Sequence, residues 1–221
     1  MQYLKVNKIQ KEFHIEGFPD GVKVIRVKGR KAQRFSDLVL HKRDLDFADE
    51  CLNCINQATN AQELINEALW RSAIIFYIKC FGNNASRSQL SERVIYKNDP
   101  KAVKVFNYFS NLRNKYIVHD ENSYSQSLPG AILNKGDKSY KIEKIICFSA
   151  LLETLTKKNI NKLHLLIKTA QLYVASQNDK ICEILTIELE ASPYNKLLSR
   201  EPVVYNAPTL KEIDKKRVLN N

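Results

Sequence analysis

Apolar residues recur every three or four positions through most of the chain, which is the spacing of one face of an α-helix. The pattern begins near Arg43 and continues with Leu45, Ala48, Leu52 and Ile55. A mainly α-helical fold is therefore expected. The main helical segments are predicted to begin near residues 43, 60, 99 and 149, with a short helix near 89–96 and a candidate break at Asn178-Asp179 in the last segment.

Two other segments have the character of β-strands. Residues 22–27 contain β-branched residues interleaved with Lys and Arg, and they follow the turn signal of residues 17–21. Residues 13–15 are the predicted partner strand, and residues 37–40 are a candidate for a further short strand. The second segment is a predicted hairpin, in which residues 131–133 and 140–147 flank Asn134-Lys135-Gly136-Asp137. The sequence thus predicts a helical bundle with a small N-terminal antiparallel β element and an inserted β-hairpin.

Charge divides the chain into three parts. The net charge is +11, of which residues 1–43 carry +7, residues 44–192 carry +1 and residues 193–221 carry +3. These parts are predicted to be a basic N-terminal β element, a helical bundle and an irregular basic C-terminal tail. A basic flank on a nearly neutral body is the electrostatic pattern of a polyanion binder. Among the N-terminal cations, Lys28, Arg30 and Lys31 are the candidates for contact with nucleic acid.

The sequence disfavours a membrane-spanning or secreted protein. The longest strongly apolar stretch runs only from Ala73 to Ile78, whereas a membrane-spanning helix needs about 20 apolar residues. The first ten residues lack the apolar region of a secretion signal. The five cysteines are odd in number and widely spread, which is unlike a disulfide framework. A cytoplasmic location without a membrane partner is expected.

Neither a metal nor a cofactor is expected from the motifs. The chain has six glycines and lacks a glycine-rich phosphate-binding loop. Cys51-x-x-Cys54 lies inside a predicted helix, and no second pair of zinc ligands follows it. Cys80, Cys147 and Cys182 lie in apolar stretches and are predicted to pack internally.

The helix that begins at Asp99-Pro100 carries the main chemical signal. A helical wheel places one apolar stripe on it and puts Arg113 and His119 within or beside that stripe, on opposite sides. Burial of a guanidinium is unfavourable unless it is paired or faces a wet cleft. Besides Arg113, residues 100–119 contain three cations and no carboxylate, so the helix offers positive charge to an anion. The stripe consists of Ala102, Val105, Phe106, Phe109, Leu112 and Tyr116.

The segment RNKYIVH, from Arg113 to His119, followed by Asp120-Glu121-Asn122, resembles the Arg-x4-6-His motif of HEPN domains (higher eukaryotes and prokaryotes nucleotide-binding). Asn114 supplies the polar residue that often follows the Arg of this motif. Members of the family place the motif late in a long helix of a bundle of about four or five helices. The similarity covers about residues 44–191 as architecture and about 106–122 as sequence.

The resemblance implies a metal-independent endoribonuclease with its site at a homodimer cleft. In this interpretation His119 acts as general base or acid, Arg113 holds the phosphate, Asn114 orients the guanidinium, and Lys115 contacts the nucleic acid. Abortive-infection and toxin members of the family suggest a role in phage defence or in a toxin–antitoxin pair. A cognate antitoxin is a possible partner, although Glu121 stands where some toxins carry a modifiable Tyr.

Other interpretations of the same residues remain open. Arg113 can instead pair with Asp120 at the edge of the core, and His119 can cap the helix C-terminus, where the helix dipole favours a cation. Arg71 on the central helix is a further candidate to reach the cleft. At the level of function, the alternatives to a ribonuclease are a non-catalytic HEPN-like module that binds RNA or protein, and a structural or regulatory dimer.

Overall fold

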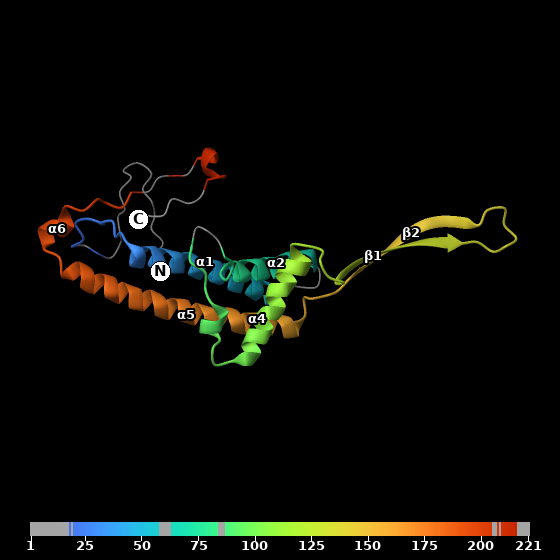
Figure 1. The fold of residues 1–221 in the computed structure, drawn as a ribbon, viewed down its shortest axis with the longest axis horizontal. Helices are drawn as coiled ribbons and strands as arrows, with labels where there is room; N and C mark the ends of the chain where they lie inside the picture. The colour runs from blue at the N-terminus through green and yellow to red at the C-terminus, as the bar shows by residue number, and fades with distance from the viewer. Residues whose placement is uncertain are drawn as a thin grey trace. The chain divides into compact units, whose positions relative to one another are not determined.

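A computed structural model describes residues 18, 20–57, 63–83, 87–204, 207 and 209–215. Most of these residues are helical, and one two-stranded antiparallel hairpin accompanies the helices, which confirms the mainly helical expectation with an inserted hairpin (Figure 1). The elements in chain order are α1 (Arg30–Gln57), α2 (Glu63–Lys79), α3 (Glu92–Ile95), α4 (Pro100–Leu112), the π-helical turn η2 (Arg113–Ile117), β1 (Ser125–Leu133), β2 (Ile142–Leu151), α5 (Lys157–Glu190), α6 (Tyr194–Leu198) and the 3₁₀ turn η3 (Leu210–Glu212).

The chain forms two compact units. We call Lys42–Gly82 with Gln89–Tyr173 the central unit. We call Met1–His41, Asn83–Ser88 and Val174–Asn221 the terminal unit. The central unit contains α2, α4, the hairpin and the adjoining halves of α1 and α5, so the motif helix and its neighbours lie in one unit.

Aromatic side chains form much of the core of the central unit. The ring centroids of Phe81 and Phe106 lie 4.8 Å apart, and Trp70 meets Phe109 edge-on at 5.9 Å. The hydroxyls of the buried Tyr77 and Tyr96 lie 2.7 Å apart, and the Tyr96 hydroxyl donates to a carbonyl of α5 at 2.9 Å. Both phenols are therefore satisfied, as buried polar groups must be. Burial raises the pKa of both tyrosines.

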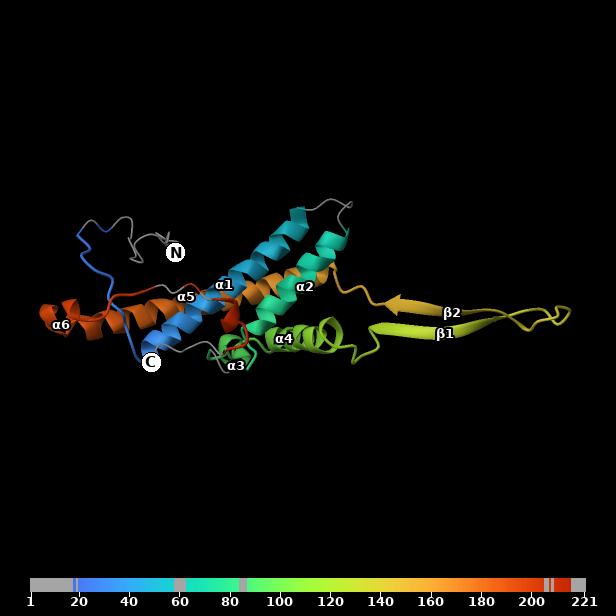
Figure 2. The same cartoon turned by 90° about the horizontal axis from the view of Figure 1, so that it is seen from above.

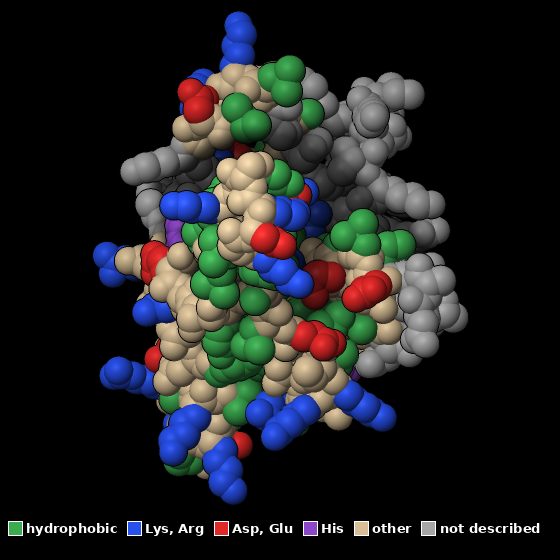
Figure 3. All heavy atoms as spheres, turned by 90° about the vertical axis from the view of Figure 1, so that its right-hand side faces the viewer, with side chains coloured by type: hydrophobic (Ala, Val, Ile, Leu, Met, Phe, Trp, Pro, Cys, Tyr) green, Lys and Arg blue, Asp and Glu red, His purple; other side chains and the backbone are tan. Residues whose placement is uncertain are grey.

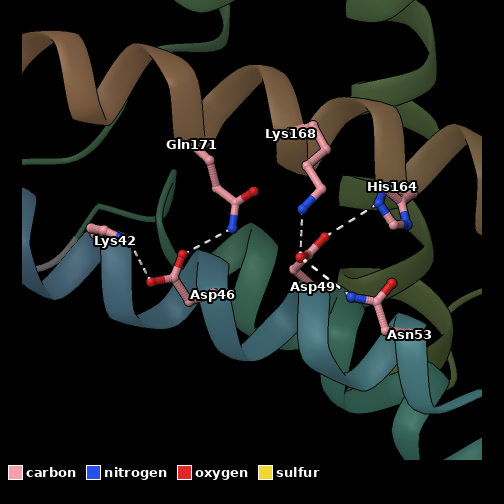
Figure 4. A network of polar contacts seen from close by, with 7 residues as sticks. All are labelled: Lys42, Asp46, Asp49, Asn53, His164, Lys168 and Gln171. Atoms are coloured by element: carbon pink, nitrogen blue, oxygen red, sulfur yellow. Dashed lines mark hydrogen bonds and ion pairs between the residues drawn. The ribbon is translucent and has the colours of Figure 1, made fainter. Parts of the chain in front are cut away.

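A polar network joins α1 to α5 within the central unit (Figure 4). Asp49 accepts from Lys168 at 2.6 Å and lies 3.4 Å from Nε2 of His164. One turn earlier, Asp46 accepts from Gln171 at 2.9 Å and from Lys42 at 2.6 Å. Both helices also bury apolar residues at helical spacing. The buried residues of the two segments are Leu45, Ala48, Leu52, Leu163, Ile167 and Ala170.

The hairpin extends away from the helices of the central unit (Figure 2). Its register pairs Ser125 with Leu151 and Leu128 with Phe148, and one irregularity falls next to Leu133. The strands are longer than the predicted 131–133 and 140–147, because β1 begins within the expected loop and β2 continues past residue 149. The turn at residues 134–137 lies between the strands as predicted.

The expectation of a β element over residues 1–43 is wrong for residues 30–43. These residues form the first half of α1, including the segment 37–40 that was predicted as a strand. The physical reason is that the apolar spacing continues upstream through the buried Leu38 and His41, and a chain with one buried face every third or fourth residue is helical. Residues 13–15 lie outside the described residues.

Residues 22–27 pair with the C-terminal tail instead of forming a described hairpin. Ile25 makes an isolated antiparallel bridge with Pro202, and Arg26 N–H donates to the Glu201 carbonyl at 2.8 Å. The described part of the tail thus contains α6 and η3 in addition to this pairing. The predicted break at Asn178-Asp179 is also absent, because α5 runs unbroken from Lys157 to Glu190. Asn and Asp disfavour a helix interior only weakly, so a long amphipathic segment continues through them.

Within the described ranges, no helix combines the length and the apolar content that crossing a bilayer requires.

We predict that the Asp49 carboxylate stabilises the packing of α1 on α5. Asp49→Ala removes the acceptor of Lys168 and leaves His164 without its carboxylate partner, so the free energy of unfolding in urea should fall by about 1–3 kcal/mol. Asp46→Ala is the matched control, since the Asp46 side chain is 37% exposed against 11% for Asp49. A more exposed ion pair contributes less, about 0–1 kcal/mol. Equal losses in the two variants would contradict this prediction.

The buried His41 makes stability depend on pH in the terminal unit. Burial lowers its pKa from 6.5 to about 4, against a smaller opposite effect of its hydrogen bond with the Ser88 carbonyl. The unfolded chain therefore binds a proton between pH 6.5 and 4 that the folded chain does not. Stability should rise with pH across this window and be lost as pH falls, by about 3 kcal/mol in total at ~1.4 kcal/mol for each pKa unit. In His41→Gln, the urea midpoint should change less with pH across this window than in the unmodified chain. An unchanged dependence on pH would refute the assignment.

Candidate active site

The motif helix α4 begins where the sequence places it. The Asp99 carboxylate accepts from the backbone N–H groups of Lys101 and Ala102 at 2.9 and 3.0 Å, and Pro100 occupies the first turn. This is a satisfied N-cap, which fixes the start of the helix. The predicted apolar stripe faces the core, since Phe106, Phe109 and Leu112 of α4 and Tyr116 of η2 are all buried.

The helix changes type at the first residue of the motif. From Arg113 to Ile117 the backbone forms a π-helical turn, and the Val118 N–H donates to the Arg113 carbonyl at 3.0 Å. The wider turn carries the buried Tyr116 toward the base of the hairpin, where its hydroxyl donates to the Leu152 carbonyl at 3.3 Å and its ring meets Tyr124. Single π-turns are rare and are concentrated at functional sites. An α-helical wheel thus no longer describes the residues after Leu112.

Arg113 and Asn114 are in direct contact. Nη1 of the half-buried Arg113 donates to Oδ1 of the exposed Asn114 at 2.8 Å. Nε of Arg113 is enclosed and has no acceptor among the described residues. A guanidinium with an unsatisfied buried donor costs free energy in the single chain. The amide oxygen of Asn114 therefore orients the guanidinium of Arg113, while the Nε donor of that guanidinium stays unused.

His119 lies beyond the end of the helix and is exposed. The helical turn ends at Ile117 with Val118 as its C-cap, and the chain then folds back so that the Glu121 N–H donates to the Lys115 carbonyl at 2.9 Å. Within the described residues, no hydrogen bond or ion pair joins Arg113 to His119 or to Asp120. The two key side chains thus follow each other closely in the chain without a hydrogen bond between them.

A cleft of about 480 Å³ lies beside the motif and touches it only through Tyr116. Arg71 lines this cleft, as considered from the sequence, but its Nε donates to Glu67 at 2.7 Å and its guanidinium lies 5.8 Å from the Tyr116 ring centre. Glu63 and Glu153 also line the cleft, so three carboxylates surround one guanidinium. This charge balance is unfavourable for a phosphate. An anion would therefore reach the motif from solvent, to which both His119 and Lys115 are exposed.

The predicted N-terminal contacts for nucleic acid are exposed, and two of them are already paired. Lys28 binds Glu201 at 2.9 Å, and Lys31 binds Glu188. Arg30 is exposed at the first position of α1, and Lys115 is exposed on η2. Exposed ion pairs contribute little free energy, so a phosphate can displace the carboxylates from these cations.

A basic pocket of about 530 Å³ in the terminal unit includes Lys28. Its lining combines four cations with the single carboxylate of Glu201. Lys196 and Arg200 of this pocket were not identified from the sequence. The pairing of Ile25 with Pro202, which brings the tail beside residues 26–28, is seen only in the structure. The excess of basic residues after position 193 was the only sequence signal for them. The full lining is Arg26, Lys28, Lys196, Ser199, Arg200 and Glu201.

Cysteines and acidic residues do not gather into a further site in the described part of the chain. No group of three or more His, Cys, Asp or Glu side chains there is placed to hold a metal ion. Cys51 and Cys80 are buried, whereas Cys147 and Cys182 are exposed. The prediction that Cys147 and Cys182 pack internally is therefore wrong, because the apolar segments that contain them are themselves exposed.

Compared with protein-family models, curated proteins and solved structures, the chain matches none of them.

Proposed function

We propose that this protein is a metal-independent endoribonuclease of the HEPN type, with Arg113, Asn114 and His119 as its active-site residues. The observation that carries the proposal is the end of the motif helix. There a π-turn begins at Arg113, the next residue orients the guanidinium, and an imidazole follows in solvent just past the helix end. The resemblance of this segment to the Arg-x4-6-His motif supplies the family and the expected setting of phage defence or a toxin–antitoxin pair.

The chemistry suits these side chains. Cleavage requires that the ribose 2′-OH lose a proton as its oxygen attacks the adjacent phosphorus, and that the 5′-oxygen gain a proton as its bond to phosphorus breaks. His119 is exposed and can exchange protons at these oxygens. The guanidinium of Arg113 binds the nonbridging oxygens and stabilises the charge that develops on them. The products are a 2′,3′-cyclic phosphate and a free 5′-hydroxyl.

A second copy of the chain completes the site in this proposal. Among the described residues no hydrogen bond joins Arg113 to His119, and Nε of Arg113 has no acceptor there. When two motif segments face each other, the Arg113 of one subunit and the His119 of the other can act on one phosphate. The acidic charge of the cleft beside Arg71 makes that cleft a poor alternative for RNA.

A non-catalytic module that binds RNA is the second candidate. It is favoured by the basic pocket of the terminal unit, which lies on residues other than those of the motif. Binding there needs only phosphate contacts, which are electrostatic and independent of sequence. This candidate retains the affinity for RNA and lacks the chemistry at His119. A cognate antitoxin or another protein partner is compatible with either candidate.

We predict that the protein cleaves RNA in the presence of EDTA and that the products carry 2′,3′-cyclic phosphates. His119→Ala should lower the single-turnover rate by about 10²–10⁴-fold, because the proton transfer is lost. Arg113→Ala should lower it by about 10²–10³-fold. Product ends are identified by mass spectrometry of a short labelled RNA.

Matched variants separate chemistry from charge. Arg93→Ala removes an equally positive side chain that is 89% exposed and remote from the motif in sequence, so it should cleave at the unmodified rate. Arg113→Lys keeps the charge but loses bidentate binding, and it should remain impaired. Intact RNA that is nonetheless bound by the unmodified protein would support the binding module and reject the ribonuclease.

We also predict that Glu201 restrains the affinity of the basic pocket for RNA. The pKa of its carboxyl is lowered, chiefly by the hydrogen bond from Lys28, so it is ionised and competes with phosphate. Glu201→Gln should tighten RNA binding and steepen its salt dependence. Neutralising Lys28, Arg30 and Lys31 together should weaken binding, with the cleavage rate at saturating protein unchanged. Filter binding over a series of salt concentrations measures both effects, and unchanged affinity in both variants would refute this interface.

A further inference from the structure

The hairpin is rich in apolar side chains, and these side chains are largely exposed. Its strands bear large side chains that are between 43% and 73% exposed, and both faces carry some of them. An isolated two-stranded hairpin is at best marginally stable in water and gains stability from further strands or a packed helix. Figure 3 looks toward the side to which the hairpin points, and hydrophobic side chains gather near the middle of that face. The exposed residues are Leu128, Ile132, Leu133, Ile142, Ile145, Phe148 and Leu151.

The outer edge of β1 is closed to another strand. The Leu152 N–H donates to the Tyr124 carbonyl at 2.8 Å, and hydrogen-bonded pairs alternate along an antiparallel ladder. By this alternation, Pro129 pairs with Cys147 at a position without mutual hydrogen bonds, so its backbone faces away from β2. Proline has no N–H there, and a proline on an edge strand prevents further pairing.

The outer edge of β2 is open. The same alternation directs the N–H and C=O groups of Ile145, Cys147, Ser149 and Leu151 away from β1. This edge carries no proline, and residues 145–152 carry no charge. An apolar and uncharged edge with free backbone groups is a template for one more strand.

A second copy of the chain fits this edge best. Two β2 strands that run antiparallel are related by a two-fold axis, so each presents the same outward groups to the other. The chain carries a net charge of +11, whereas residues 125–133 and 145–152 are neutral, so two copies approach there with little repulsion. The exposed apolar side chains of the hairpin add apolar surface that a second copy can cover, and an interface of standard size takes about 800 Å² from each partner.

We propose that two copies of this protein pair along β2 and form a four-stranded antiparallel sheet across a two-fold axis. The new ladder satisfies the outward backbone groups of both strands, and the widened sheet shields apolar side chains of each hairpin with those of the other. This interface uses residues outside the candidate active site and does not depend on the proposed ribonuclease activity. The β2 edge is the contact that holds the two copies together, so a chain that loses it is a monomer.

Proline substitutions on the two edges test the proposal with matched chemistry. Ser149→Pro removes an outward N–H of β2 and leaves the β1–β2 ladder intact, as Pro129 does on β1. Ala131→Pro removes an outward N–H on the β1 edge, which is already closed. By sedimentation velocity of the full chain at equal concentrations, Ser149→Pro should halve the mass of the assembly, and Ala131→Pro should keep the unmodified mass. Circular dichroism confirms that each variant is folded.

Two further measurements keep the proposal falsifiable if a proline disturbs the hairpin. Ile145→Lys places a charge beside the open edge without altering the backbone, and it should also halve the mass. A short bismaleimide should join two chains through the exposed Cys147, as identified by mass spectrometry of the linked peptide, and Cys147→Ser should abolish that product. A monomeric unmodified chain, an unchanged mass in both Ser149→Pro and Ile145→Lys, or linkage through Cys54 or Cys182 alone would overturn the proposal.

Discussion

The contact of α1 with α5 through the Asp49 carboxylate is the interaction on which the central unit depends. Asp49 lies among the apolar residues of the α1 stripe and is nearly buried, so it needs the hydrogen bonds from Lys168 and Asn53. The bond from Asn53 lies within α1, whereas the bond from Lys168 joins the two helices and forms only where Lys168 lies opposite Asp49. The same carboxylate that would oppose burial by itself therefore selects how α5 lies on α1, and the aromatic core of α2 and α4 packs against that pair.

The end of α4 shows how this packing decides the geometry of the candidate site. Tyr116 is held by the Leu152 carbonyl at the base of the hairpin and by the rings around it. A π-turn lets the chain satisfy this contact, and it also rotates the following residues away from the positions of an ideal helix. Arg113 contacts Asn114 within this turn, and His119 lies exposed just past its end. The geometry of the candidate site is thus coupled to the hairpin base.

The two ends of the chain illustrate a different dependence on tertiary structure. The excess positive charge of both ends is visible in the composition, and the structure brings part of it into one pocket. Glu201 lies among these cations and pairs with Lys28. The basic surface is therefore restrained by its own carboxylates, and the net charge alone overstates how freely it would bind a polyanion.

Local features of this protein were determined by the sequence itself. The cap at Asp99, the apolar stripe of α4 and the turn between β1 and β2 depend on neighbours within a few positions, and the structure has all three. The first half of α1 was mistaken for strand, since short apolar runs fit both periods until burial of residues such as Leu38 is known. The π-turn, the exposure of His119 and the pairing of Ile25 with Pro202 were decided only by the tertiary structure. Each of these depends on contacts between residues distant in sequence, whose free energy outweighs the local preferences that a sequence pattern records.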